Sequence, residues 1–294
     1  MIPYIYVLIS LACFSGAGHW YGEFARRYSP VWMALVKAGV AGLAFGISMV
    51  ALFLLGWDQP ANLLHPANLI FFLSGAIGLG IGDVFLIKAF SALGSARTLI
   101  IFSFEPVLLG VLAYFLFDQS VTLKQFLAIF ILIACVWLIS LERARLLGHW
   151  DFKGVMAAMT GVVLDNFGVI MTRKAFDLTG AHVFTANFIR TTGAILVLLI
   201  FFYARRNSIL RPIQQMKKRD RTILLLASFA GTYISLTMWL SAVKVGHLAT
   251  LSALAGLGPL AGSLWEWYLT GQRPSKMLIY CLLLTIPGLY LILS

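Results

Sequence analysis

Residues 68–92 read NLIFFLSGAIGLGIGDVFLIKAFSA, and residues 221–245 read RTILLLASFAGTYISLTMWLSAVKV. Each stretch is long and apolar enough to cross a hydrocarbon core of roughly 30 Å as a helix, which takes about 20 residues. The second stretch follows the first at a shift of 153 residues, which places Gly78 on Gly231. The pair therefore predicts membrane-spanning helices in a chain that repeats itself.

The same shift lays residues 1–141 on residues 154–294 without a gap. Self-similarity at a fixed spacing is the mark of an internal repeat. Other aligned pairs are Ala89 with Ala242, Pro106 with Pro259, Phe14 with Phe167, Lys37 with Arg190, and Leu116-x-x-Gln119 with Leu269-x-x-Gln272. We therefore expect two domains, residues 1–141 and 154–294, joined by a loop at 142–153.

The composition excludes a soluble protein. Hydrophobic residues make up 61% of the chain and charged residues 11%, whereas soluble domains carry roughly 25% charged residues. The net charge of +11 comes from Lys and Arg that lie largely between the apolar runs, which is a topology signal and not a nucleic-acid surface. The three cysteines stand alone inside apolar runs, so we expect neither a disulfide framework nor a zinc site.

Apolar runs recur along the whole chain. They cover residues 2–22, 30–55, 68–92, 95–117, 122–141, 153–175, 182–204, 221–245, 248–270 and 275–293. Five spans per repeat force the second repeat to lie upside down relative to the first, as in many secondary transporters. We expect an all-α polytopic membrane protein with ten transmembrane helices in two inverted five-helix repeats; a duplicated scaffold or channel is the alternative.

The basic loops predict how the chain lies in the membrane. The segment 205–220 is rich in Lys and Arg, and such loops stay on the cytoplasmic side. Both termini are then expected to face outward.

Several motifs resemble one known family. They are Lys88-Ala89-Phe90-Ser91-Ala92-Leu93-Gly94-Ser95-Ala96, Phe104-Glu105-Pro106-Val107, Leu116-Phe117-Asp118-Gln119-Ser120-Val121-Thr122 and Gly271-Gln272-Arg273-Pro274-Ser275. The chain resembles the drug/metabolite transporter superfamily, in particular its EamA-type ten-helix branch. The resemblance implies a secondary transporter of small organic metabolites such as amino acids or amines, acting as an exporter in a prokaryotic cytoplasmic (inner) membrane.

The chain departs from that family at two places. Gln119 and Gln272 stand where members usually carry Glu, so no role of that acid is carried over. The loop with Asp58 has no Lys or Arg, whereas members usually have a basic loop there and an internal N-terminus.

Three acidic residues fall well inside their predicted spans: Asp83, Glu105 and Asp165. Ionisable groups in a membrane are costly, which makes them candidates for function. The repeat-equivalent residues are not acidic, as expected for acids that serve a substrate rather than the architecture. Buried carboxylates can exchange protons near neutral pH or attract a cation. Alternatively, each bonds a neighbouring helix or pairs with a buried Lys or Arg.

Lys37 and Arg190 occupy equivalent places, about two turns inside their spans. They are candidates to contact a substrate carboxylate, although long cationic side chains also snorkel to the interface or form salt bridges. His19 and Glu23 share one helix face, which suggests a gating or proton-relay role or a solvated pair at the interface. Aromatic side chains expected in a cavity complete the candidates: Trp20, Phe85 and Trp239.

Motifs typical of enzymes are missing from the sequence. It has no His-Glu-x-x-His, no Walker A loop and no glycine-flanked serine elbow. We expect no enzyme activity, metal or cofactor, and partners limited to a small-molecule substrate, the lipid bilayer and protons, with the chain a monomer or homodimer. The alternatives are an uncoupled facilitator or exchanger, a polytopic membrane enzyme and a structural partner subunit.

Overall fold

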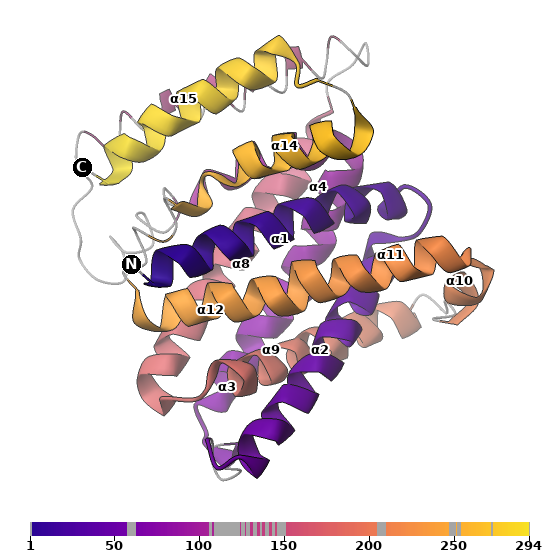
Figure 1. Cartoon of the computed structure of the whole chain (residues 1–294), viewed down its shortest axis with the longest axis vertical. Coiled ribbons are helices and arrows are strands. Elements are labelled where there is room, and N and C mark those ends of the chain that lie inside the picture. Colours follow the sequence, from indigo (N-terminus) through magenta and orange to yellow (C-terminus); the bar gives the residue numbers. More distant parts are fainter. Residues whose placement is uncertain are drawn as a thin grey trace.

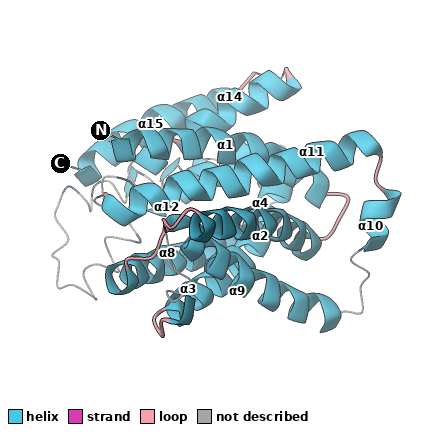
Figure 2. Ribbon diagram, turned by 60° about the horizontal axis from the view of Figure 1, so that its bottom comes forward, coloured by secondary structure: helices cyan, strands magenta, loops and turns pink. Residues whose placement is uncertain are grey.

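The computed structural model describes residues 2–57, 63–105, 151–204, 210–246, 254–271 and 273–293, with Leu251 and scattered single residues between 106 and 150. Within these residues the regular structure is helical and contains no strand (Figures 1 and 2). The chain is therefore an all-helical protein over the part that the structure describes.

The helices of the first half are α1 (Ile2–Ala25), α2 (Pro30–Leu54), α3 (Asn68–Ser74), the π-helix η2 (Gly75–Gly82), α4 (Asp83–Leu93) and α5 (Ser95–Phe102). Those of the second half are α8 (Phe152–Thr179), α9 (Val183–Ala204), α10 (Leu210–Gln215), α11 (Lys218–Ser228), the π-helix η3 (Phe229–Ile234), α12 (Ser235–Val245), α14 (Gly258–Thr270) and α15 (Lys276–Leu293).

Six of these helical segments are long and apolar enough to cross a membrane. They are Ile2–Ala25, Pro30–Leu54, Asn68–Leu93, Phe152–Thr179, Val183–Tyr203 and Lys218–Val245. Each matches one predicted span, so the chain is a multi-pass membrane protein. Of the other four predicted spans, α5, α14 and α15 cover described parts of three, and the fourth, at 122–141, lies largely outside the described residues. The total of ten stays a prediction.

Local signals in the sequence set where several helices begin and end. The hydroxyl of Ser29 accepts a hydrogen bond from the backbone N–H of Trp32 at the start of α2, and a proline follows it. Asp151 caps α8 in the same way, accepting from the N–H of Gly154 at 3.1 Å. Gly180 ends α8 with a φ of 62°, a left-handed conformation that glycine adopts without steric cost.

The two halves interlock. The first helix of each half packs on the third-span helix of the other, because α1 contacts α12 and α8 contacts α4. The equivalent helices α2 and α9 pack on each other. Figure 1 shows α14, α1 and the α11–α12 rod lying side by side, with α4 and α8 crossing behind them. Any space at the centre is therefore lined by both halves.

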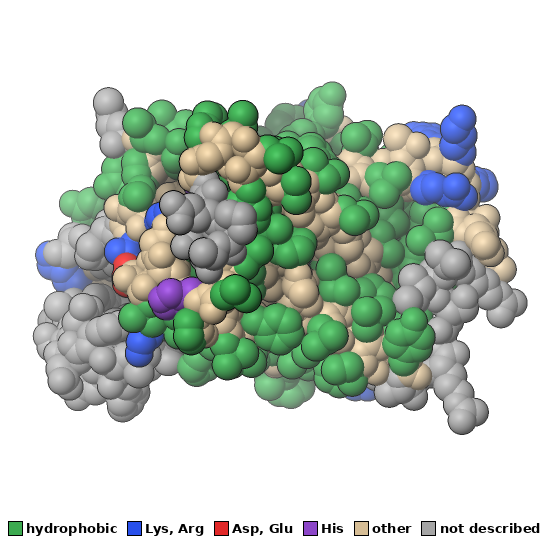
Figure 3. Space-filling view, turned by 90° about the horizontal axis from the view of Figure 1, so that it is seen from below, with side chains coloured by type: hydrophobic (Ala, Val, Ile, Leu, Met, Phe, Trp, Pro, Cys, Tyr) green, Lys and Arg blue, Asp and Glu red, His purple; other side chains and the backbone are tan. Residues whose placement is uncertain are grey.

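The outer surface suits lipid. Large apolar side chains point outward from the spans, among them Leu43, Ile47, Leu54 and Leu226. Figure 3 shows one face on which hydrophobic side chains cover the middle, while Lys and Arg side chains gather mainly towards its two ends. This distribution is expected where a hydrocarbon core surrounds the middle and water meets the ends.

Each half contains a π-helical segment at an equivalent place. Residues 75–82 form η2, and η3 covers 229–234, within the range that the shift of 153 predicts. π-Helices are rare and frequently accompany functional sites. η2 interrupts the helix formed by α3 and α4, and η3 interrupts the helix formed by α11 and α12. Both segments lie near the centre of the molecule.

Two cationic side chains tie α8 to α12. Arg173 Nη1 donates to the carbonyls of Val243, Lys244 and Gly246 at the end of α12, the shortest bond being 2.6 Å. In return, Lys244 Nζ donates to the carbonyls of Gly180 and Ala181 just after α8. Each cation thus satisfies carbonyls at the C-terminal end of the other helix, where positive charge is favoured.

We expect Arg173→Ala to lower the free energy of unfolding by about 1–3 kcal/mol, because it leaves carbonyls without their charged donor. Thermal unfolding of the purified protein in detergent measures the effect. Lys174→Ala is the matched control, since Lys174 is exposed on the same helix. Equal unfolding temperatures for the two variants would contradict the capping role.

Candidate functional site: a charged cavity between the two halves

A cavity lies at the centre of the bundle. Its volume is about 110 Å³, whereas a single buried water needs roughly 10–15 Å³ on the same scale. The lining residues come from α1, α2, η2, α4 and α5 in the first half and from α8, α9, η3, α12 and α14 in the second. The cavity therefore has room for several waters or a small polar molecule.

The lining follows the internal repeat. Eight pairs of lining residues are 153 positions apart: Lys37 and Arg190, Gly78 and Gly231, Leu79 and Thr232, Gly82 and Ser235, Asp83 and Leu236, Leu86 and Trp239, Phe102 and Ala255, and Glu105 and Gly258. Next to them, Ser103 Oγ donates to the carbonyl of its own equivalent, Gly256, at 3.4 Å. Because equivalent residues of the two halves touch there, the cavity lies where the two halves meet.

A buried ion pair crosses the cavity wall from α2 to α4. Lys37 Nζ lies 2.7 Å from Asp83 Oδ2, and the two side chains are 3% and 9% exposed. The ammonium also lies 5.3 Å from the centre of the Tyr21 ring, a cation–π contact. Removing two charges from water is costly, so such a pair is stable only while both partners are present.

Arg190 on α9 is bonded on one side only. Its Nε donates to Ser74 Oγ at 3.2 Å, and Thr172 Oγ1 donates to the same oxygen at 3.0 Å. Its Nη1 has no hydrogen-bond partner within the described part of the chain, although the residue is only 1% exposed. The guanidinium is held in place by α3 and keeps a donor to spare.

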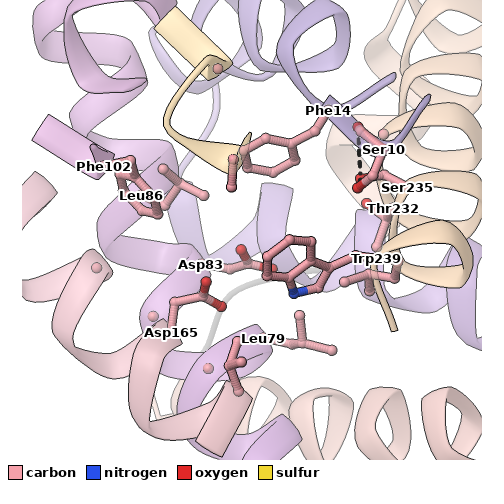
Figure 4. Close-up of a pocket in the computed structure, with 18 of the residues that line it drawn as sticks. Ser10, Phe14, Leu79, Asp83, Leu86, Phe102, Asp165, Thr232, Ser235 and Trp239 are labelled. Carbon is pink, nitrogen blue, oxygen red and sulfur yellow. Dashed lines mark hydrogen bonds between the residues drawn. The ribbon is translucent and has the colours of Figure 1, made fainter. Parts of the chain in front are cut away.

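Two further carboxylates line the cavity. Glu105 is 8% exposed, and its Oε1 has no hydrogen-bond partner among the described residues. Asp165 on α8 is half-buried, and Figure 4 shows its carboxylate beside that of Asp83. Gly78 leaves room next to Asp165, since a Cβ there would lie 3.6 Å from Asp165 Oδ1.

The structure brings six of the nine candidate residues to this cavity: Lys37, Asp83, Glu105, Asp165, Arg190 and Trp239. His19, Trp20 and Phe85 are not among its lining residues. His19 instead packs edge-on against Trp20, which stacks on Phe24, and Phe85 packs against the cluster of α4 and α8 that includes Ala89. Trp20 follows the lining residue Phe14 by six residues on α1. At about 100° per residue, their side chains point about 120° apart around the helix axis, so Trp20 faces away from the cavity side of α1.

Small hydroxyl residues in the lining were not among the candidates. Ser10 and Ser235 share a hydrogen bond of 2.9 Å, shown dashed in Figure 4, and Ser235 Oγ also bonds the carbonyl of Ser10. Thr232 lies beside them and bonds Tyr21. The sequence signal for them was a hydroxyl residue within an otherwise apolar span. A search for charged residues inside the spans does not select such residues. Phe14 and Phe102 add aromatic rings to the lining, with Phe102 beside Leu86 on the side opposite these hydroxyls (Figure 4).

No cluster of three or more His, Cys, Asp or Glu suited to a metal ion occurs among the described residues. The side chains that line the cavity offer ion pairs, hydrogen bonds and aromatic surfaces.

Comparison with known proteins identifies the chain. The family model of the EamA-like transporter family matches residues 1–141 and 152–294. The chain belongs to the EamA-like transporter family. Members of this family are transporters, so the resemblance read from the motifs is confirmed, and with it a small-molecule substrate and a membrane location.

The fold of this EamA-like transporter is also seen in a solved structure. One crystal structure, described only as that of a protein, has a TM-score of 0.67 over 96% of this chain and 95% of its own. At 16% sequence identity that likeness concerns the fold alone. No curated protein matches the sequence.

Proposed function

We propose that this EamA-like protein is a secondary transporter that moves small organic molecules by alternating access between two inverted five-helix repeats, with ten spans in all. The observation that carries the proposal is the central cavity, lined by equivalent residues of both halves and holding five charged side chains. Charges are kept inside a membrane protein at a cost, and chiefly where a substrate or ion passes.

The packing supports alternating access. The first helix of each half packs on the other half, and one cavity lies between the halves. Such halves can rock about the cavity, so that opening it at one end closes it at the other. The π-helices η2 and η3 contribute lining residues at equivalent places, and π-helical turns are frequent at functional sites. Residues 1–141 and 154–294 are the proposed moving units, with 142–153 between them.

The finer assignments rest on the family resemblance. We assign amino acids, amines or related metabolites as the cargo, efflux as the direction, and a prokaryotic inner membrane as the location. The chain acts as a monomer or homodimer.

Proton coupling is part of the proposal, with the cavity carboxylates as carriers. Asp165 and Glu105 carry it best, because neither forms an ion pair within 4 Å in the described part of the chain. A specific observation favours an uncoupled facilitator as the second candidate: Asp83 is already neutralised by Lys37 at 2.7 Å, as a structural acid would be.

Proteoliposomes with an imposed pH gradient separate the two candidates. External mixtures of L-amino acids and biogenic amines should collapse the gradient, reported by a trapped pH dye. Asp165→Asn and Glu105→Gln should each slow the collapse at least about tenfold, because a neutral amide cannot carry the proton. Asp177→Asn, at an exposed position of the same helix as Asp165, is the control. Unchanged coupling in both cavity variants would remove proton exchange and leave the facilitator.

A further inference from the structure

The repeat that shapes the cavity is broken in its charges. In the first half, Lys37 faces Asp83 and the two form an ion pair. In the second half the equivalents are Arg190 and Leu236. Arg190 therefore occupies the place of a paired cation but lacks the acid that would pair with it.

The same break occurs at Glu105. Its equivalent across the cavity is Gly258, which offers no side chain. Glu105 Oε1 and Arg190 Nη1 both lack partners within the described part of the chain, although both residues are more than nine-tenths buried. Buried polar atoms in native proteins are almost always satisfied. A third cavity atom without a hydrogen bond of good geometry, Asp83 Oδ2, lies 2.7 Å from the ammonium of Lys37. The two atoms left without a charged partner have opposite character and share one cavity, which points to a ligand that satisfies both.

Glu105 and Arg190 reach the cavity from different sides of the bundle. Glu105 follows α5, which packs mainly on α14 and α8, whereas Arg190 lies on α9, which packs mainly on α2, η2 and α3. The cavity therefore offers a spare guanidinium donor on the α9 side and a spare carboxylate oxygen on the α5 side. The rest of the lining includes apolar and aromatic side chains, among them Phe14, Phe102 and Trp239.

We propose that the ligand of this cavity is a zwitterion with an apolar body: its anionic group accepts hydrogen bonds from Arg190 Nη1, and its ammonium group binds Glu105, with Asp165 beside it. The inference rests on the proposed transport function and narrows its cargo. A plain amine would leave the Arg190 donor unpaired. A plain carboxylic acid would leave Glu105 unpaired and would face two further carboxylates.

Matched compounds test this on the purified full-length protein. Each set consists of a zwitterion, the amine that lacks its carboxylate and the acid that lacks its ammonium. The sets are L-phenylalanine, 2-phenylethylamine and 3-phenylpropionate; L-leucine, 3-methylbutylamine and 4-methylpentanoate; and 6-aminohexanoate, hexylamine and hexanoate, in which the charges are farther apart. The readout is the concentration that gives half of the maximal rise in unfolding temperature.

In at least one set, the zwitterion should act at a concentration at least about tenfold lower than either partner, since each lost charged hydrogen bond is worth about that factor. Arg190→Gln should abolish the advantage over the amine and leave that over the acid, and Glu105→Gln should do the reverse. Because the compounds are first compared on the unaltered protein, a variant that fails to fold does not remove the test.

An amine or an acid that acts as well as its zwitterion in every set would overturn the inference, and so would the absence of any response to all three zwitterions. A flux screen of sugars, nucleosides, amines and acids in proteoliposomes then tests transport separately. Flux of some other solute would keep the transporter and reject the zwitterion, whereas no flux of any solute would reject the transport function as well.

Discussion

Lys37→Met is expected to lower the free energy of unfolding by about 3–5 kcal/mol, the largest effect that we predict for stability. The substitution keeps a long side chain but removes the charge 2.7 Å from Asp83. Asp83 is then a buried carboxylate without its counter-ion, and removing one partner of a buried ion pair costs about that amount. Thermal or denaturant unfolding in detergent measures the change.

The double variant Lys37→Met/Asp83→Leu should recover most of that loss. Its leucine is the residue that the second half carries at this place, Leu236, and replacing both partners of a buried ion pair with apolar groups is often neutral. Lys88→Met serves as the control, because Lys88 is exposed. A single variant as stable as the control, or a double variant no better than the single, would contradict a tight buried pair.

Gly75→Ala should both destabilise the protein and impair transport. A Cβ at Gly75 would overlap the backbone carbonyl of Arg190, so η2 and α9 would have to separate. Overpacking of this kind costs typically about 1–3 kcal/mol. The shift would also move Arg190, which lines the cavity. Unfolding temperature and solute flux in proteoliposomes are the two measurements.

A second glycine provides a replicate and a third provides the control. A Cβ at Gly193 on α9 would meet the carbonyl of Phe72 across the same helix crossing, so Gly193→Ala should behave like Gly75→Ala. By contrast, a Cβ at Gly39 on α2 would have no neighbour within 4 Å. Gly39→Ala should leave stability unchanged or raise it by up to about 1 kcal/mol, since alanine favours a helix. Loss of stability at Gly39 as well would refute the close-approach argument.

Much of the fold could be read from the chain because the signals are local. The runs at 68–92 and 221–245 are apolar along their length, and the structure gives helices over Asn68–Leu93 and Lys218–Val245. Ser29 and Asp151 fix helix starts through bonds to N–H groups three residues away. The π-helices η2 and η3 were not foreseen, since the glycines in the third span indicate close contact equally well in an α-helix.

The candidate site was only partly predictable. Depth within a span selected Asp83, Glu105 and Asp165, and each lines the cavity, because a charge far from both membrane surfaces has few places to go other than the interior. Aromatic residues carry no such constraint. Trp20 and Trp239 are both aromatic residues in predicted spans, yet only Trp239 lines the cavity.

The sequence by itself determined that the chain is a helical membrane protein with a repeat at a shift of 153 residues, since hydropathy and self-similarity belong to the chain alone. Only the tertiary structure decided that Lys37 pairs with Asp83 while Arg190 and Glu105 keep unpaired atoms on the same cavity. The reason is physical: a few ångströms decide a salt bridge, and that separation depends on how each helix is rotated and packed against helices more than a hundred residues away.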